Sequence, residues 1–356
     1  MGLPNINITF RTAAAAAVQR SQKGVVGLIL KDANTQAAGE HHIRTSADIP
    51  DALDADNRGY VERALIGYLN PPREVILYVL AGDAEDLDDG LAFFATLEVD
   101  YLCGPVDCTS EEASAIAAWV KARRAEFSTV KAVLPNTAAD SEGIINYATA
   151  SADVGETAYG APAFCSRIAG LIAGTPMTIS CTYAPLPEVP DIERLSRADM
   201  DAAIDAGKLI LYHDGEKAKV ARGVNSLVTT TRDKGAPFQK IKIVEAADMI
   251  QHDLRRACED SYIGKYANSY DNKCLLITAV KGYLTQLEID GILQPGSSQV
   301  GIDMAAQEAY LTSTGVDVSK MSEQEIKEAN TADKVFLSAE TKILDAIEDI
   351  DLKITL

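Results

Sequence analysis

Hydrophobic and polar side chains alternate near the beginning of the chain. Ile6, Ile8 and Phe10 are separated by polar residues, which is the period-two pattern of a β-strand with one apolar face. A continuous apolar run over residues 24–30 follows and is typical of a buried strand. A single strand at a chain terminus needs a partner strand to be ordered. We therefore expect residues 1–22 to form an extended arm that precedes the core.

Between residues 56 and 173, apolar segments of strand length alternate with segments of helix length. The pattern predicts helices over 56–69, 111–127 and 164–173, and strands over 75–80, 101–103 and 130–134. The middle helix has signals at both ends, because Thr109 or Ser110 can cap its start and basic side chains lie near its end. Residues 83–90 are expected to form an acidic loop. Such alternation indicates an α/β layer with a partly parallel sheet.

After a proline-rich connector over residues 185–190, the pattern becomes more helical. A helix over 196–206 precedes a hairpin, whose turn is marked by Asp214-Gly215. The remaining elements are a glycine C-cap at Gly207, hairpin strands over 209–212 and 217–222, helices over 240–263, 274–287, 303–312 and 322–330, and strands over 334–342 and 350–356. This second half is expected to be α+β.

The length and charge of the chain limit the classes of protein that it can belong to. Its 356 residues favour two or three domains, and a hydrophobic content of 47% excludes a largely disordered chain. The formal net charge of −19 repels phosphates, so we expect no nucleic acid partner. Arg11 interrupts the beginning of the chain, which does not read as a signal peptide, and no apolar run approaches the roughly 18 residues that a membrane span needs.

Residues that could carry catalysis or bind a metal do not form a recognisable set. The six cysteines contain no C-x-x-C pair and no zinc-finger spacing, so we expect reduced, mostly buried thiols. His41 and His42 are adjacent but have no acidic partners at helical spacing. A nucleophile elbow, a P-loop and a dinucleotide-binding motif are all absent from the sequence. We expect no catalytic residue, no metal site and no cofactor.

Several motifs occur in a specific order along nearly the whole chain. They are residues 2–10 leading to 23–32, residues 169–177 followed by Ser180, residues 221–229, residues 242–245 with Asp248 and Asp253, residues 262–268, and the ending 336–356. Within them, the most characteristic positions are Arg222, Gly223, Asn225, Ser226, Gly264 and Asn268. In this order the motifs resemble the contractile phage tail sheath family, in the short form found in Gram-positive phages and phage-tail-like R-type bacteriocins.

This resemblance implies a structural protein that is not an enzyme. Sheath subunits form homo-hexameric rings, which stack helically around an inner tube. Contraction from a metastable extended state drives the tube through a target cell envelope. The implied partners are further copies of the chain, the inner tail tube protein, and the baseplate and tail terminator proteins. The implied location is the host bacterial cytoplasm during assembly, and then the tail of the released virion or bacteriocin particle.

The resemblance also implies an α/β and α+β multidomain fold. The expected parts are an N-terminal arm (1–22), an N-terminal α/β segment of the core (23–95), a middle α/β domain (96–236), a mixed α+β C-terminal domain (237–342) and a C-terminal strand arm (343–356). The middle domain is expected to have a subtilisin-like fold. No Asp/His/Ser set with that protease's motifs is present, so peptidase activity is not implied.

The arms of sheath proteins are implied to add strands to the sheets of neighbouring subunits. The expected strand-exchange residues are Ile6, Ile8, Phe10, Arg11, Ile350, Leu352, Ile354 and Leu356. Residues 1–30 carry three basic residues and no acid, a net of +3, whereas residues 343–356 carry four acids and one lysine, a net of −3. Opposite charges could steer the arms into register, although chance can produce such a difference in short segments.

Contact with the inner tube is assigned to a polar segment of mixed charge, residues 319–334. Its candidate tube-facing residues are Lys320, Glu323, Lys327 and Lys334. Two alternative functions stay open from the residues alone. One is a subunit of another structural polymer, such as a shell or a tube. The other is an α/β hydrolase, which would need a catalytic triad that the sequence does not display.

Overall fold

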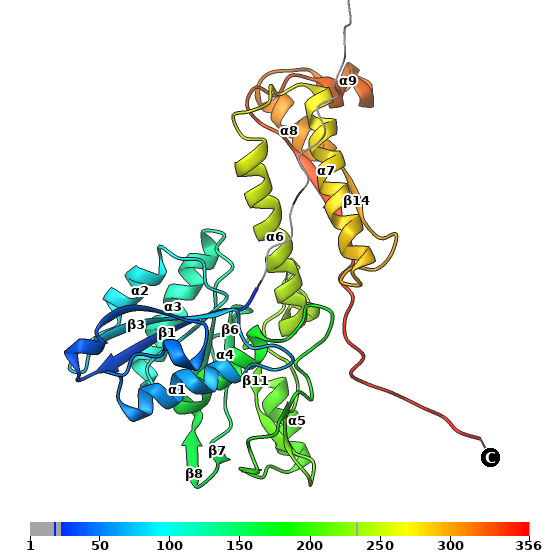
Figure 1. Cartoon of the computed structure of the whole chain (residues 1–356). Helices are drawn as coiled ribbons and strands as arrows, with labels where there is room; N and C mark the ends of the chain where they lie inside the picture. Colours follow the sequence, from blue (N-terminus) through cyan, green and yellow to red (C-terminus); the bar gives the residue numbers. More distant parts are fainter. Residues whose placement is uncertain (1–17, 19–22, 233, 356) are drawn as a thin grey trace, which may run out of the picture. The chain divides into compact units, whose positions relative to one another are not determined.

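The computed structural model describes residue 18 and residues 23–232 and 234–355 (Figure 1). These residues form two compact units. The first, which we call the sheet unit, comprises the described residues of 23–250 together with 345–355. The second, the helical unit, comprises Gln251–Leu344. The chain therefore returns to the sheet unit after it has formed the helical unit.

A seven-stranded sheet is the centre of the sheet unit, in the order β11-β6-β5-β4-β1-β3-β2. All neighbours pair in parallel except β2, which is antiparallel to β3. The strands are β1 (Val25–Asp32), β2 (Gly39–Ile43), β3 (Glu74–Ala81), β4 (Tyr101–Cys103), β5 (Lys131–Pro135), β6 (Ile144–Tyr147) and β11 (Lys208–Leu209). This is the partly parallel sheet that the alternation of strands and helices predicts.

Helices cover both faces of this sheet (Figure 1). One face packs against α1 (Ala55–Ile66) and α4 (Ala161–Ala173), and the other against α2 (Asp88–Phe94) and α3 (Ser110–Ala125). The central strand β1 has apolar side chains on both sides: Val26, Leu28 and Leu30 belong to the first core, and Val25 and Ile29 to the second. Two-sided burial explains why its sequence is a continuous apolar run.

Two small sheets and one further helix complete the sheet unit. One sheet has the order β10-β7-β8 and the other β12-β13-β9. Their bounds are β7 (Ser151–Val154), β8 (Thr157–Gly160), β9 (Pro185–Leu186), β10 (Asp191–Ile192), β12 (Leu211–His213) and β13 (Ala218–Val220); the helix is α5 (Arg197–Asp205), and 3-10 turns occur at Thr35–Ala37, Ser46–Asp48 and Ala236–Gln239.

The helical unit contains three helices and a two-stranded antiparallel sheet, apart from the end of α6. The long helix α6 (Ile241–Ser261) begins in the sheet unit and ends in the helical unit. The other elements are α7 (Tyr270–Ile289), β14 (Gln299–Ile302), α8 (Met304–Ser313), a 3-10 turn at Val318–Lys320, α9 (Glu323–Glu328) and β15 (Leu337–Glu340). Inside the unit, the Tyr283 hydroxyl donates to Asp253 Oδ2 at 2.5 Å.

Three predicted elements differ from the structure. The expected acidic loop over 83–90 ends early, because α2 begins at Asp88. The expected strand over 209–212 is divided, since β11 pairs with β6 in the large sheet and β12 pairs with β13 in the hairpin. The expected strand over 350–356 is absent from the described residues 350–355. They pair with no other strand in the described chain, and without a partner the backbone has no ladder to join.

Candidate assembly interface at the roots of the terminal arms

The C-terminal segment has the composition of a strand but no strand partner. From residue 345 to 355 the described chain contains no helix or strand, and Figure 1 shows it as an extended ribbon. Its apolar side chains Ile347, Ile350, Leu352 and Ile354 are between 74% and 87% exposed. Four large apolar side chains this exposed on one short segment make it a candidate interaction surface.

The beginning of this segment is held by ion pairs. The Glu348 carboxylate is 6% exposed, and its Oε2 lies 3.1 Å from Arg222 Nε and 3.3 Å from Lys240 Nζ. Its Oε1 accepts hydrogen bonds from Thr182 Oγ1 at 2.6 Å and Ser180 Oγ at 3.2 Å. Two flanking acids add contacts: Asp345 Oδ2 lies 2.5 Å from Lys240 Nζ, and Asp349 Oδ2 lies 2.6 Å from Arg222 Nη2.

We call residues 345–349 and their partners the C-terminal root. Burial by itself raises the pKa of Glu348, but the Thr182 hydroxyl and the positive charges of Lys240 and Arg222 outweigh it and lower this pKa below its ordinary value. The carboxylate is therefore ionised at neutral pH. Both oxygens have partners, as a buried charge requires.

The characteristic motif at residues 221–229 forms the floor of this root. The Gly223 N–H donates to Thr182 Oγ1 at 2.9 Å, and a Cβ at this position would lie 2.8 Å from Cys181 Sγ. Only glycine fits against Cys181 here, and the bond holds Thr182 in position for Glu348. The sequence placed Arg222 in a family motif and Glu348 in an arm, and the structure brings the two together.

The next two motif positions attach this segment to the core. Asn225 is fully buried, and its Nδ2 donates to the Phe238 carbonyl at 2.7 Å. The buried Ser226 Oγ donates to the Ser141 carbonyl at 2.9 Å, and its backbone N–H donates to the Ile144 carbonyl at 2.8 Å. Both side chains are therefore structural and hold the segment that carries Arg222.

A second root lies where the core begins. Lys23 Nζ is 2.6 Å from Glu245 Oε2 in α6. The backbone N–H groups of Gly24 and Val25 both donate to Asp100 Oδ2, at 2.7 and 2.8 Å. We call these contacts the N-terminal root. The predicted arm residues Ile6, Ile8, Phe10 and Arg11 lie outside the described residues, as does Leu356.

Buried charges connect the N-terminal root to the sheet. Lys131 Nζ in β5 lies 3.2 Å from Glu245 Oε1 and 3.0 Å from Asp248 Oδ2, and Arg124 in α3 makes a two-bond contact with Asp248 at 2.9 Å. The Tyr101 hydroxyl also donates to Glu245. Burial raises the pKa of Glu245, but the Lys131 and Lys23 ammonium groups overcome this effect and hold it at about 2.

The other predicted positions lie in the helical unit. Gly264 has a φ of +74°, a conformation that favours glycine. Asn268 Nδ2 lies 2.9–3.0 Å from three oxygens, those of the Thr331 hydroxyl and of the Ala332 and Lys334 carbonyls. Asn268 therefore organises the loop that carries Lys334.

The four candidate tube-facing side chains are polar, and three of them form local ion pairs. Lys320 lies 3.3 Å from Asp317, and Glu323 pairs with Lys327 at 2.5 Å one helical turn away. Lys320 is exposed. These ion pairs lie on a solvated surface around α9. No contact among the described residues distinguishes this surface as a binding site.

The described residues include no candidate metal centre. No group of three or more His, Cys, Asp or Glu side chains there could hold a metal ion. Four of the six free cysteines are buried and two are half-buried. His42, for which the sequence offers no acidic partner at helical spacing, lies 2.7 Å from Glu40 and 3.2 Å from Glu74 on the sheet edge. Pairing of β2 with β3 brings Glu74 to His42, whereas Glu40 lies two residues away within β2 itself.

The described helices lack the features of a membrane span. Neither the long helices α6 and α7 nor any other helix in the described part of the chain combines the length and apolar character needed to cross a bilayer.

Comparison with known proteins places this architecture. Residues 82–226 match the phage tail sheath protein central domain, and residues 233–356 match the phage tail sheath C-terminal domain. The tail sheath protein of Clostridium phage phiCD119 is 41% identical over 359 residues, which cover 99% of each chain.

Two solved structures have the same fold. The sheath tail protein of Desulfitobacterium hafniense superposes with a TM-score of 0.70 at 18% identity, covering 84% of this chain and 94% of that one. The helical sheath of the anti-feeding prophage in its contracted state gives a TM-score of 0.73 at 17% identity, covering 100% and 99%. With the full-length similarity to the clostridial phage protein, these findings show that the chain belongs to the phage tail sheath protein family.

Proposed function

We propose that the chain is the structural subunit of a contractile tail sheath, which polymerises as stacked six-fold rings around an inner tube and contracts from a metastable extended state. The observation that carries this proposal is the 41% identity over 99% of both chains with a phage tail sheath protein. The likeness to a sheath in its contracted state supports contraction. The proposed partners are further copies of the chain, the tube protein, and the baseplate and terminator proteins, with assembly in the host cytoplasm and no role for nucleic acid or membrane insertion.

Subunits are proposed to connect by strand exchange. Ile350, Leu352 and Ile354 are exposed on a segment that has no partner strand among the described residues. Strand addition gains about 0.5–1.5 kcal/mol net per main-chain hydrogen bond, so an arm with six such bonds contributes several kcal/mol before the cost of ordering it. The apolar residues Ile6, Ile8 and Phe10 are proposed to act in the same way at the other end of the chain.

The two-stranded sheet β14–β15 is the proposed acceptor. Sheets of two strands are marginally stable alone, and three of the four residues of β15 are exposed. An arm added at this edge would extend the sheet and cover the exposed backbone. The exposed edge gives a concrete location for the contact between copies.

The remaining assignments follow from membership of the family and are proposals. The middle domain, residues 96–236, is proposed to have a subtilisin-like arrangement without its catalytic triad, and the chain to have no catalytic activity and no cofactor. The proposed parts of the chain are the N-terminal arm (1–22), the N-terminal segment of the core (23–95), the middle domain (96–236), the C-terminal domain (237–342) and the C-terminal arm (343–356). The surface with Lys320, Glu323, Lys327 and Lys334 is proposed to face the tube.

Electron microscopy of the purified protein tests the function. A sheath subunit is expected to form wide hollow cylinders with six subunits per ring, in the contracted lattice when no tube protein is present. Closed shells or narrow solid filaments would instead support the alternative structural polymer. A peptidase and esterase screen tests the hydrolase alternative, which the separated catalytic residue types do not favour.

A further inference from the structure

Both arm roots contact the beginning of the same helix. Lys240 directly precedes α6 and binds Asp345 and Glu348 of the C-terminal root. Glu245, in the second turn of α6, binds Lys23 of the N-terminal root. Five residues of helix correspond to a rise of only about 7.5 Å. Two segments from opposite ends of the chain are thus held on one short stretch of backbone.

The same small region of the core lies between the roots. Cys181 lines one pocket together with Lys23 and Glu245. Its neighbours in sequence, Ser180 and Thr182, donate hydrogen bonds to Glu348. The two roots are therefore also adjacent through the segment 180–182, independently of the helix.

This part of α6 is rigidly attached to the sheet unit. Ile241, Ile243 and Val244 are buried, and the Ile241 N–H donates to the Gly223 carbonyl at 3.0 Å. One turn beyond Glu245, Asp248 is held by Lys131 and Arg124 from the sheet and α3. Closely packed elements with paired buried charges transmit displacement instead of absorbing it.

We propose that the segment Lys240–Glu245 is the shared mechanical anchor of both arms, and that Lys23, Arg222, Lys240 and Glu348 are positioning residues which couple the two arms of one subunit. A pull on the C-terminal arm by one neighbouring copy then reaches the N-terminal arm through a turn of helix. This inference rests on the proposed strand exchange, and it adds that the two exchanges are not independent.

The charged side chains of the two roots differ in solvent exposure, so salt weakens their ion pairs to different extents. In the N-terminal root the Lys23 and Glu245 side chains are 13% and 4% exposed. In the C-terminal root Lys240 and Arg222 are 29% and 31% exposed. Salt screens exposed pairs more than buried ones. The C-terminal root is therefore the first to release as ionic strength rises.

The test is a double-mutant cycle on the full-length protein, read as the critical concentration for cylinder formation in sedimentation. Glu348→Gln removes the buried carboxylate charge of the C-terminal root but keeps the size of the side chain, and Lys23→Met removes the ammonium group that pairs with Glu245 in the N-terminal root. Each is expected to raise the critical concentration roughly tenfold, which corresponds to about 1.4 kcal/mol per junction. Because the roots share an anchor, the double variant is expected to stay well below the hundredfold rise of independent sites.

Three controls keep the outcomes distinct. Asp201→Asn removes one charge of an exposed pair with Arg197 in α5 and is expected to leave assembly unchanged. Lys240→Met repeats the experiment from the helix side, and circular dichroism checks that each variant is folded. A hundredfold rise in the double variant, or normal assembly of folded Glu348→Gln and Lys240→Met, overturns the shared anchor. If Glu348→Gln, Lys240→Met and a deletion of residues 350–356 all assemble normally, the proposed strand exchange is contradicted. If the deletion blocks assembly but the two substitutions do not, only the shared anchor is contradicted.

Discussion

Gly170 shows how closely α1 and α4 approach each other on one face of the sheet. A Cβ at this position would lie 1.9 Å from the carbonyl oxygen of Ala64 in α1. Nearby, the Ser166 hydroxyl donates to the Tyr60 carbonyl at 2.7 Å, so α4 is attached to the α1 backbone directly. Any side chain at Gly170 must force the two helices apart.

We therefore expect Gly170→Ala to lower the free energy of unfolding of the sheet unit by roughly 1–3 kcal/mol or more, the usual range for overpacking. Gly282→Ala in α7 is the matched control, because a Cβ there meets nothing within 4 Å. It is expected to stabilise its helix by about 0.5–1 kcal/mol. Urea unfolding followed by circular dichroism, with hydrogen exchange to assign each transition to its unit, measures both. Equal midpoints for Gly170→Ala and the parent chain would contradict the packing argument.

Glu245 is the residue whose charge the N-terminal root depends on. Its folded pKa of about 2 is below the ordinary value of 4.5, so its contribution to stability is complete above pH 4.5 and is lost as the pH falls toward 2. The positive groups that face it are Lys23 and Lys131, and Tyr101 donates to it.

At pH 7 we expect Glu245→Gln to cost roughly 3–5 kcal/mol, as is usual when one partner of a buried ion pair is removed. The difference in unfolding free energy between this variant and the parent chain is expected to shrink as the pH falls from 4.5 to 2.5. Urea titrations at several pH values measure this difference. A difference that stays constant over that interval would show that Glu245 stabilises the folded state by something other than its charge.

At this scale the sequence offered candidate residues but not their partners. Arg222 stood out in a motif, and Glu348 counted as one of four acids in the tail. Their contact joins positions 126 residues apart, and no local pattern encodes such a pairing. The proposed anchoring role of Lys240 and Glu245 could not be predicted from the sequence either, because it depends on two remote segments that contact the same helix.

At the scale of elements, the local signals were sufficient for long helices and buried strands. Of the two predicted caps of α3, Thr109 and Ser110, the structure uses Thr109, whose Oγ1 accepts from the Glu112 N–H at 3.2 Å. β4 matches its predicted bounds, Tyr101–Cys103. Several other short strands, such as β6, β7 and β11, were missed or merged, because a run of two to four residues carries little periodicity and is formed by its neighbours in the sheet.

In the proposed strand exchange, the C-terminal tail becomes a strand only when it pairs with another copy of the chain. We expect Leu352→Pro to leave the subunit folded and to prevent long cylinders, since proline removes a ladder donor. Leu352 is 74% exposed, so the substitution removes little packing within the subunit. Leu352→Val keeps the donor and a side chain suited to strands, and is expected to assemble. Microscopy and sedimentation of both variants decide the matter, and cylinders of full length from Leu352→Pro would argue against strand exchange.

At the scale of the whole molecule, two electrostatic effects on assembly have opposite signs. The subunit carries a net charge of −19, and copies with the same charge repel one another. The proposed pairing of the arms has the opposite sign, because residues 1–30 carry +3 and residues 343–356 carry −3 and would attract each other. Salt weakens both effects over a Debye length of about 8 Å at physiological ionic strength. A salt series alone therefore does not separate them.

Removing one acid from the tail distinguishes general repulsion from steering by the arms, because the two effects change the assembly rate in opposite directions. Asp351→Asn changes the net charge from −19 to −18 and the tail from −3 to −2. If general repulsion governs association, the variant assembles faster; if the tail steers the arm, it assembles more slowly. We expect slower assembly at low salt, measured by light scattering, because steering acts through charges close to the contact. The difference is expected to vanish as salt rises.

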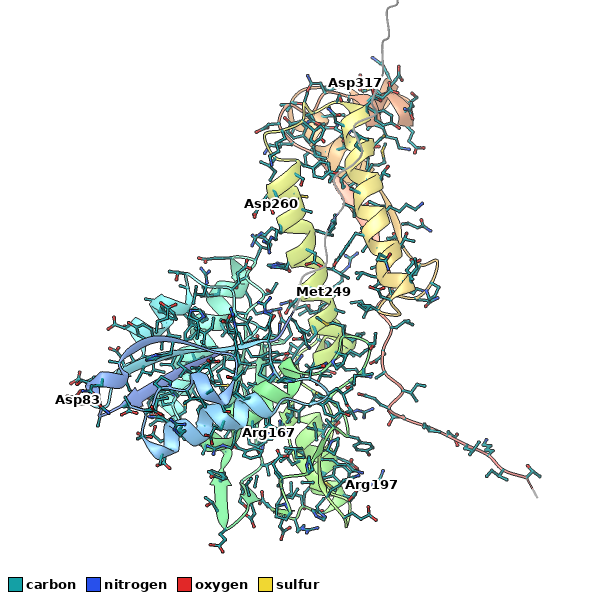
Figure 2. All side chains as sticks on the ribbon, in the orientation of Figure 1. Asp83, Arg167, Arg197, Met249, Asp260 and Asp317 are labelled. Atoms are coloured by element: carbon teal, nitrogen blue, oxygen red, sulfur yellow. The ribbon has the colours of Figure 1, made fainter. Side chains whose placement is uncertain are left out.

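Asp83→Asn provides the matched control, since this exposed acid follows β3 and belongs to neither arm. It makes the same change in net charge and is expected to assemble at least as fast as the parent chain. Figure 2 labels Asp83 at one end of the sheet unit. If Asp351→Asn and Asp83→Asn change the rate equally, the charges of the arms have no specific role, and only the net charge of the subunit governs how quickly copies meet.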